Sequence, residues 1–242
     1  MLSKEQIKQI KGLHQKKNRK DKQQFIIEGP KMIEEALSTV PDAVLQIYVT
    51  EQYVETTAFP KDKTTIVSSK IIHQLSGLKQ PQDVLAVCTF LDLKISPSSL
   101  KIGLDNIQDP GNFGTILRLA AWFGVTEIIA SNDCVDCYNP KVVQASMGGI
   151  FNVKVSYLNL IEFCSSYQHP IYGAMLSGEN IYRSSLSPTG ILLMGNEGKG
   201  LNTSLQKYIT KSLYIPKIGK GESLNVATAT GILLSEFTRK NM

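Results

Sequence analysis

Three apolar runs of strand length in the second half of this sequence each lead directly into a turn rich in glycine and asparagine. The turns lie in DNIQDPGNFGTILRLA (105–120), LLMGNEGKGL (192–201) and IPKIGKGESLNVATA (215–229). In open α/β sheets, ligands bind beyond the carboxyl ends of the strands. The pattern therefore predicts a parallel sheet with a binding site built from these three turns.

Apolar periodicity predicts strands and helices in alternation along the whole chain. Ser3 and Gln6 have the spacing of a capping box, which predicts a helix through about residue 15. The next predicted elements are strands at 25–28, 43–50, 64–68 and 83–90 and helices at 31–37 and 71–75. A strand at 101–107, a helix at 115–125 and a strand at 127–130 follow, and the alternation continues through 142–150, 153–158, 160–167, 170–176, 190–198 and 212–216 to a last helix of about 225–240.

The stretch LDLKISPSSL (91–100) has little periodicity, one proline and three serines, and it divides this pattern into two regions. We place the boundaries at residues 1–92 for a small α/β domain, 93–100 for a linker and 101–242 for a larger α/β domain. Buried parallel strands covered by helices are the architecture expected for the second domain.

The composition is that of an ordinary globular protein, with 42% hydrophobic and 19% charged residues among 242. No run of about 18 apolar residues is present, and the N-terminal segment has lysines and glutamines where a secretory signal would have its apolar stretch. We expect a cytoplasmic protein with no membrane partner. Cys134 and Cys137 form a lone CxxC, but no second pair stands at zinc-ligand spacing, so we expect unpaired thiols and no metal.

The positive charge is concentrated at the N-terminus. Residues 1–24 contain eight basic and two acidic side chains, a net charge of +6, whereas the whole chain carries +5. This distribution is typical of a contact with a phosphate backbone, although a solvated, lysine-rich helix would look the same. The charge thus indicates a polyanionic partner without naming it.

The turns do not fit the common nucleotide-binding motifs. GNEGKG has Leu193 and Gly200 where a P-loop requires a glycine and a serine or threonine, and the GKG at 219–221 fails the same test. No GxGxxG follows a strand. The three histidines, His14, His73 and His169, lie far from all three turns in the sequence, so a Ser-His-Asp set is excluded.

Taken together and in this order, the three turns resemble the motifs of the SpoU (TrmH-like) family of RNA ribose methyltransferases in the SPOUT superfamily. The resemblance covers roughly residues 100–242. The segment KKNRKDKQQFIIEGPKMIEEAL (16–37) is similar to the L30e-like substrate-binding domain of bacterial ribosomal RNA members. The resemblance implies a parallel sheet with a deep trefoil knot, S-adenosyl-L-methionine bound in that knot, and a homodimer with its site near the subunit interface.

The resemblance also implies roles for individual residues. Those expected to bind the cofactor are Met194, Gly195, Ile215, Ser223, Leu224 and Asn225. The catalytic residues carried over are Arg118, Asn112 and Glu197. Arg118 would act either as the base that takes the proton of the 2′-hydroxyl or as a clamp that binds the adjacent phosphate and stabilises the developing alkoxide. Glu197 would orient either the knot loops or Asn112.

Each of these residues has a structural explanation when taken alone. Asn112 could end a turn, Arg118 could be a surface charge, Glu197 could be solvated, and Ser223 could cap the last helix. Their joint occurrence in order favours the functional interpretation. Glycine at position 195 would allow a ligand to approach the backbone closely.

The sequence therefore predicts a methyltransferase that acts on the 2′-hydroxyl of structured RNA, ribosomal and of the 23S type. The 2′-hydroxyl distinguishes RNA from DNA, which suits a basic domain joined to a ribose site. The expected RNA contacts are Lys16, Lys17, Arg19 and Lys20. The alternatives are a transfer-RNA 2′-O-methyltransferase of the same superfamily and a non-catalytic RNA-binding or ribosome assembly protein.

Overall fold

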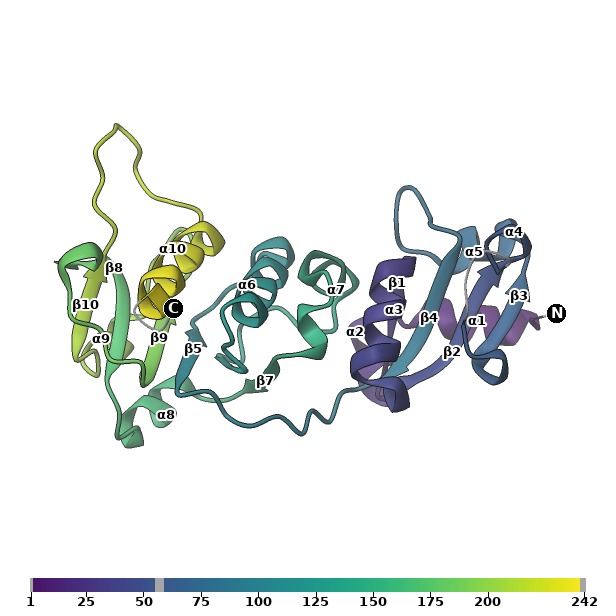
Figure 1. The fold of residues 1–242 in the computed structure, drawn as a ribbon, viewed down its shortest axis with the longest axis horizontal. Coiled ribbons are helices and arrows are strands. Elements are labelled where there is room, and N and C mark those ends of the chain that lie inside the picture. Colours follow the sequence, from purple (N-terminus) through teal and green to yellow (C-terminus); the bar gives the residue numbers. More distant parts are fainter. Residues whose placement is uncertain (1, 55–58, 240–242) are drawn as a thin grey trace.

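A computed structural model describes residues 2–54 and 59–239, which form two α/β units joined along one side (Figure 1). The N-terminal unit is built around a four-stranded sheet with strand order β1-β4-β2-β3. Its elements are α1 (Lys4–Gly12), α2 (Lys16–Lys22), β1 (Gln24–Glu28), α3 (Pro30–Thr39), β2 (Val44–Thr50), α4 (Glu51–Val54), β3 (Thr64–Val67), α5 (Ser69–Leu75) and β4 (Val84–Thr89).

The N-terminal sheet is apolar on both faces. β4 pairs antiparallel with β1 and β2, and β2 pairs parallel with β3. Alternation along the strands sends Ile26 and Leu85 toward the side covered by α1 and α5. Their neighbours Ile27 and Ala86 belong to the cluster on the opposite side, together with Met32 of α3. The small α/β domain expected from the sequence is thus a sheet between two helical layers.

The capping box predicted for the first helix is confirmed. The Ser3 hydroxyl accepts from the Gln6 N–H, and the Gln6 side chain accepts from the Ser3 N–H. The helix ends earlier than predicted, at Gly12, and a second short helix, α2, follows after a tight turn. The sequence analysis missed α2, because a run of lysines carries no apolar periodicity.

The C-terminal unit contains a six-stranded sheet of order β10-β8-β9-β5-β6-β7, in which all neighbouring strands are parallel. The predicted fold class is confirmed. Its elements are β5 (Leu100–Leu104), α6 (Pro110–Trp122), β6 (Glu127–Ala130), α7 (Pro140–Ser146), β7 (Lys154–Tyr157), α8 (Leu160–Ser166), β8 (Ile171–Asn180), β9 (Gly190–Met194), α9 (Thr203–Gln206), β10 (Lys211–Tyr214) and α10 (Val226–Thr238).

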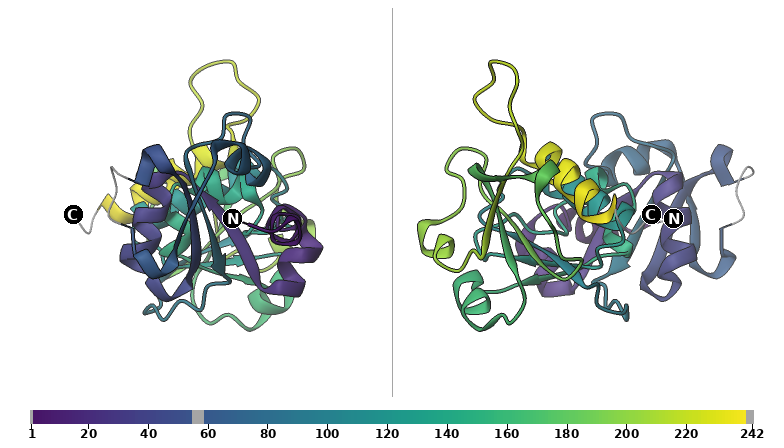
Figure 2. Two further views of the ribbon diagram at one scale, coloured as in Figure 1. Left: turned by 90° about the vertical axis from the view of Figure 1, so that its right-hand side faces the viewer. Right: turned by 60° about the vertical axis from the view of Figure 1, so that its left-hand side comes forward.

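Helices cover both faces of this parallel sheet, as Figures 1 and 2 show. Along β9, Leu192 and Met194 join the cluster that includes residues of α6, α7 and α10. The alternate residues, Ile191 and Leu193, join the cluster on the side of α8 and α9. Burial on both faces explains why the strands read as continuous apolar runs rather than as an alternating pattern.

The predicted boundary between the linker and the second domain shifts by one residue in the structure. Leu100, placed in the linker, is the first residue of β5. Residue 240, the predicted end of the last helix, lies outside the described residues. The deep trefoil knot concerns the threading of the chain, which strand order and register do not define, and it stays a prediction.

The two units share one continuous apolar core. The ring of Tyr138, in the loop before α7, stacks on Phe90 with centroids 4.0 Å apart and lies 4.7 Å from Phe25. The Tyr138 hydroxyl also accepts from the backbone N–H of Leu91 at 2.8 Å. Aromatic packing and a backbone hydrogen bond therefore join the N-terminal sheet to the larger domain.

None of the helices in residues 2–54 and 59–239 combines the length and the apolar composition that a membrane span requires.

Gly114 is a test of how tightly α6 and α7 pack. A Cβ atom at Gly114 would lie 2.5 Å from the Val142 carbonyl oxygen and 2.6 Å from the Ala145 Cβ. We expect Gly114→Ala to lower the free energy of unfolding by about 1–3 kcal/mol, because backbone must move to admit the methyl group. Urea denaturation measures the change.

Gly231 in α10 offers a matched control, since a Cβ there would meet only the Leu119 side chain, at 3.4 Å. Gly231→Ala should be neutral or should stabilise by up to about 1 kcal/mol, as expected for a glycine inside a helix. Equal effects of the two substitutions would contradict the close approach of α6 and α7.

Candidate functional site

The first two glycine- and asparagine-rich turns meet at the carboxyl edge of the large sheet. β5 and β9 are neighbours with Leu104 opposite Met194, so the chain leaves both strands at the same place. The Asp105 N–H donates to the Met194 carbonyl at 2.9 Å, and the Asn202 N–H donates to the Asp105 carboxylate at 2.7 Å. The Asn196 side chain donates to the Asn106 carbonyl at 2.9 Å. The predicted convergence of these turns is confirmed.

The turn after β9 folds back on itself. Asn196 and Gly200 exchange two backbone hydrogen bonds of 3.1 and 2.9 Å, and the Asn196 side-chain oxygen accepts from two further N–H groups inside the turn. A Cβ at Gly195 would lie 2.3 Å from the Gly200 carbonyl carbon. Gly195 is therefore required by the turn's own backbone, a reason different from the close approach of a ligand that the sequence suggested.

The third turn is a long loop between β10 and α10 that projects from the body of the protein (Figures 1 and 2). Residues 216–224 form no backbone–backbone hydrogen bond, and the Ile218 side chain is fully exposed. The loop ends at Asn225, whose side-chain oxygen caps α10 by accepting from the N–H groups of Ala227 and Thr228 at 3.0 and 3.1 Å. The alternative explanation of Ser223, as the cap of the last helix, does not hold, because Asn225 occupies the N-cap position.

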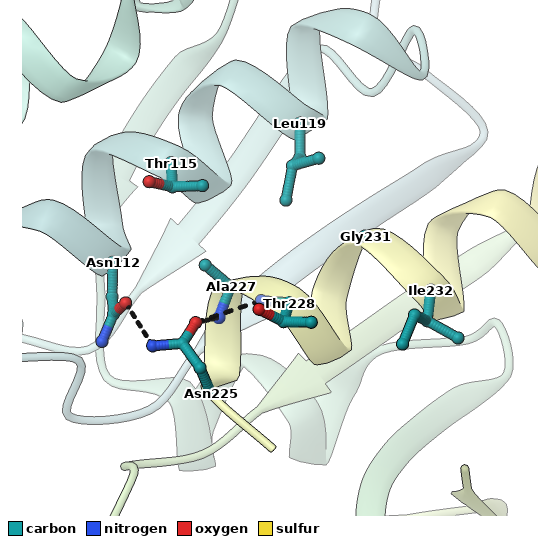
Figure 3. Close-up of a pocket in the computed structure, with 8 residues that line it drawn as sticks. All are labelled: Asn112, Thr115, Leu119, Asn225, Ala227, Thr228, Gly231 and Ile232. Atoms are coloured by element: carbon teal, nitrogen blue, oxygen red, sulfur yellow. Dashed lines mark hydrogen bonds between the residues drawn. The ribbon is translucent and has the colours of Figure 1, made fainter.

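One polar side chain from each turn joins a single hydrogen-bonded chain. Asn225 donates to the Asn112 side-chain oxygen at 2.8 Å, and Asn112 donates to the Glu197 carboxylate at 2.8 Å. Figure 3 shows Asn112, on the first turn of α6, facing Asn225 at the start of α10. This is the contact that an orienting role of Glu197 toward Asn112 requires, and the role itself stays a prediction.

The direction of every bond in this chain is determined by the cap on α10. Because the Asn225 oxygen accepts from two backbone N–H groups, its amide nitrogen must be the group that faces Asn112. Asn112 then accepts with its oxygen and has its own amide nitrogen left to donate. A carboxylate, which only accepts, is the matching partner at position 197. The three turns are thus locked in one arrangement.

Arg118 lies farther along α6, about 9 Å from Asn112 along the helix axis at 1.5 Å per residue. Its side chain is exposed and makes no hydrogen bond or ion pair with the residues that the structure describes. Its backbone is held by the short helix Gly149–Phe151, where a Cβ at Gly149 would lie 2.9 Å from the Arg118 Cα. The structure therefore fixes the base of this side chain and leaves the guanidinium available.

A pocket of about 370 Å³ lies between α6 and α10. Of the residues predicted to bind the cofactor or to act in catalysis, Asn112 and Asn225 line it; the others in the lining are Thr115, Leu119, Ala227, Thr228, Gly231 and Ile232. Met194 is buried at the end of β9, and Ile215 and Leu224 stand at the two ends of the projecting loop. The six predicted cofactor contacts stay a prediction.

The four basic residues predicted to contact RNA differ in their exposure to solvent. Lys16, Lys17 and Lys20 are exposed on α2. Arg19 is only 2% exposed, and its guanidinium donates to the Asp136 carboxylate and to the carbonyls of Leu13 and His14. Arg19 must therefore be removed from the predicted RNA contacts, because its donors are already used inside the protein.

The cysteines are unpaired and buried, as predicted for Cys134 and Cys137. Burial raises the pKa of the Cys88 and Cys137 thiols to about 12 each, which leaves them protonated and unreactive at neutral pH. In the described parts of the chain, no three His, Cys, Asp or Glu side chains are grouped so that they could hold a metal ion.

The sequence analysis missed the residues whose side chains hydrogen-bond the first turn to the second, above all Asp105 and Asn196. Asp105 is 8% exposed, and burial raises the pKa of its carboxyl despite the hydrogen bond from the Asn202 N–H; Asp133 adds to the rise. Its position directly after a buried strand, at the edge where the site was expected, is the signal that could have identified it.

Two regions of the chain match known families. Residues 99–235 match the sequence model of the SpoU rRNA Methylase family, and residues 4–86 match that of the MRM3-like substrate binding domain. A protein of Bacillus subtilis (strain 168) named 23S rRNA (guanosine(2553)-2'-O)-methyltransferase RlmP is 31% identical over 239 residues, which span 95% of this chain and 94% of the relative.

Solved structures resemble the whole chain. A TrmH-family protein from Porphyromonas gingivalis is 35% identical, with a TM-score of 0.88 over 99% of both chains. An rRNA methyltransferase from Sinorhizobium meliloti, solved with AdoMet bound, is 28% identical, with a TM-score of 0.86 over 100% of this chain and 97% of the other. Both domains of this chain are therefore found together in other proteins.

Asp105 gives the site a defined response to pH. A carboxyl whose pKa is raised by folding keeps its proton where the unfolded chain has lost it. Its contribution to stability therefore falls as the pH rises from about 4, its ordinary value, through the raised pKa. In Asp105→Asn this loss is absent, so the variant should gain free energy of unfolding relative to the wild type across that window. Urea denaturation at several pH values measures the difference, and parallel pH profiles would contradict a raised pKa.

Proposed function

Because the chain belongs to the SpoU rRNA Methylase family, we propose that it transfers a methyl group from S-adenosyl-L-methionine to the 2′-hydroxyl of a ribosomal RNA nucleotide. The resemblance drawn from the three turns is thereby confirmed at the level of the family. The observation that carries the activity is the hydrogen-bonded chain Asn225–Asn112–Glu197, which joins all three turns at the edge where a parallel sheet binds its ligands.

The third turn fits a cofactor with both polar and apolar parts. Its backbone at 216–224 makes no backbone–backbone hydrogen bond with the described residues, and only the Gly221 carbonyl accepts from a side chain, that of Lys217. Leu224 is a large apolar side chain half exposed at the end of the turn. The residues proposed to hold the cofactor are Met194, Gly195, Ile215, Ser223, Leu224 and Asn225. When bound, S-adenosyl-L-methionine supplies a methyl group on a positively charged sulfur, ready for attack by an oxygen nucleophile.

We assign Arg118 the role of a charge clamp. A guanidinium hardly ever loses its proton in a protein, so it is a poor general base. It is well suited to bind a phosphate in a bidentate manner and to stabilise the negative charge that develops on the ribose oxygen. Its exposure and its free donors support this role, and the proton of the 2′-hydroxyl then leaves to water or to phosphate.

The N-terminal unit favours ribosomal RNA over the two alternatives. It matches a substrate-binding domain, and the 23S rRNA enzyme of Bacillus subtilis aligns with nearly the whole chain rather than with the larger domain alone. A non-catalytic RNA-binding protein would be expected to have lost Asn112, Arg118 or Glu197, and all three are present. We propose that Lys16, Lys17 and Lys20 contact RNA phosphates.

We also propose that the protein acts as a homodimer in the cytoplasm, where ribosomal RNA is found. Trp122, at the end of α6, is 81% exposed, and Leu119 and Ile232 line the pocket between α6 and α10. A second copy covering this face would remove a large apolar surface from water.

Methyl transfer to RNA is the direct test. The purified protein, given S-adenosyl-L-methionine labelled in its methyl group, should label a 23S ribosomal RNA transcript and leave total transfer RNA unlabelled. Mapping of 2′-O-methylated positions should then place the label on one ribose. Label on transfer RNA alone would establish the alternative substrate, and label on neither RNA would refute the proposed activity.

Cofactor selectivity is expected from the absence of P-loop and GxGxxG motifs. Calorimetry should show micromolar binding of S-adenosyl-L-methionine or its demethylated product and no binding of ATP or NAD. Folded protein that gives no heat with either methionine compound would contradict the assignment of the three turns.

The clamp role of Arg118 predicts a defect in the chemical step. Arg118→Ala should lower turnover about a hundredfold or more, as with the loss of a preorganised charge-stabilising donor, while the affinity for S-adenosyl-L-methionine stays within about twofold. Arg239→Ala removes another exposed arginine, at the end of α10, and should leave turnover unchanged. Unchanged turnover in Arg118→Ala would make this arginine a surface residue.

A further inference from the structure

We propose that the buried ion pair between Arg19 and Asp136 holds helix α2 in a fixed position against the catalytic domain. An RNA bound by the lysines of α2 is then aligned so that one particular ribose lies at the methyl-transfer site. This inference rests on the proposed function and concerns how the two domains share one substrate. Arg19 and Asp136 are positioning residues in it, since neither is proposed to touch RNA.

The ion pair crosses the joint between the domains. Arg19 belongs to α2, whereas Asp136 lies in the loop that connects β6 to α7 of the large sheet. The Arg19 Nε and Nη2 atoms both donate to one Asp136 oxygen, at 3.2 and 2.6 Å. The other Asp136 oxygen accepts from the Tyr138 N–H at 3.1 Å, and the Asp136 side chain is 13% exposed. A charge pair with so little access to water is screened only weakly by salt.

The remaining donor atom of Arg19 secures α2 to its own domain. Nη1 donates to the carbonyls of Leu13 and His14, both at 3.0 Å, in the turn between α1 and α2. The His14 ring is in turn hydrogen-bonded to the Leu75 carbonyl at 2.7 Å, at the end of α5. One guanidinium therefore connects the helical layer of the N-terminal domain to a loop of the catalytic domain.

The same helix presents its other cations to solvent. Lys16, Lys17 and Lys20 are exposed, and their ammonium groups make no ion pair or hydrogen bond with the described residues. In a seven-residue helix with four lysines and one arginine, only the arginine is buried. An arginine suits the buried position because its planar fork can bond a carboxylate and two carbonyls together.

These contacts have a consequence for substrate binding. Lysines on a loosely held helix must be ordered before they meet the phosphates of an RNA seated on the catalytic domain, and this ordering cost offsets part of their attraction. Lysines on a helix fixed to the catalytic domain meet those phosphates without that cost. Their contribution to RNA affinity should therefore depend on an ion pair that they do not contact.

A double-mutant cycle measures this dependence. The four proteins are the wild type, Lys16→Gln/Lys17→Gln/Lys20→Gln, Asp136→Asn, and all four substitutions together, each titrated with a 23S ribosomal RNA transcript at three salt concentrations. In the wild-type background the lysine substitutions should weaken binding tenfold or more and flatten the salt slope by about 2–3 units, at roughly 0.7–0.9 for each of the three lost phosphate contacts. In the Asp136→Asn background the same substitutions should weaken binding less than threefold.

Two further variants serve as controls. Asp133→Asn makes the same chemical change in the same loop, at an exposed residue without an ion pair to the described residues, and the lysine effect should persist in full there. If Asp136→Asn does not fold, Arg19→Met/Asp136→Asn replaces it in the cycle, because removing both charges leaves no unpaired ion buried. Melting temperature and S-adenosyl-L-methionine affinity verify that each protein is folded.

The outcomes separate the inference from the function. A lysine effect that shrinks in the Asp136→Asn background supports positioning, because a purely structural ion pair would leave the two effects multiplicative. A lysine effect of equal size in both backgrounds overturns the inference, even if the wild type methylates 23S RNA as proposed. A wild type that neither binds nor methylates this RNA overturns the proposed function and the inference with it.

Discussion

The pairing of β5 with β9 is the constraint on which the site depends. These strands lie 90 residues apart in the sequence, yet their parallel register puts Leu104 opposite Met194, and both chains leave the sheet at one edge. The contacts between the first two turns depend on this shared edge. The Asp105 N–H donates to the Met194 carbonyl, and the Asn112 amide donates to the Glu197 carboxylate. Asn225 brings the third turn into the same structure, and the cap on α10 gives the whole chain of side chains its direction.

This edge of the sheet could be predicted from the sequence because each of the three turns shows the same local pattern. A buried parallel strand reads as an apolar run, and the turn after it reads as glycine and asparagine, so the three positions could be found without knowing which strands are neighbours. The contact of Glu197 with Asn112 corresponds to one of the two roles that the family resemblance implied for this carboxylate. Strand order, by contrast, depends on pairings across the whole chain.

Residue roles that the sequence could not reveal depend on where the chain meets a distant segment, starts a helix or folds back on itself. Arg19 looks like one more cation in a basic run, and only the fold brings Asp136, 117 positions later, against it. Ser223 and Asn225 are equally good caps on local grounds, and the start of α10 decides between them. Gly195 was expected to let a ligand approach the backbone, whereas the space for its Cβ is closed by the return of the chain at Gly200, which no periodicity reveals.

The projecting loop has a consequence for the energetics of the catalytic cycle. A ligand that draws residues 216–224 inward must restrict a backbone that makes no backbone–backbone hydrogen bond within the described parts of the protein, and each residue so restricted costs roughly 1 kcal/mol of conformational entropy. Part of the favourable contact energy is therefore offset, and the affinity is lower than the number of contacts would suggest. The same entropy is recovered when the spent ligand departs, which favours rapid exchange of product for fresh substrate.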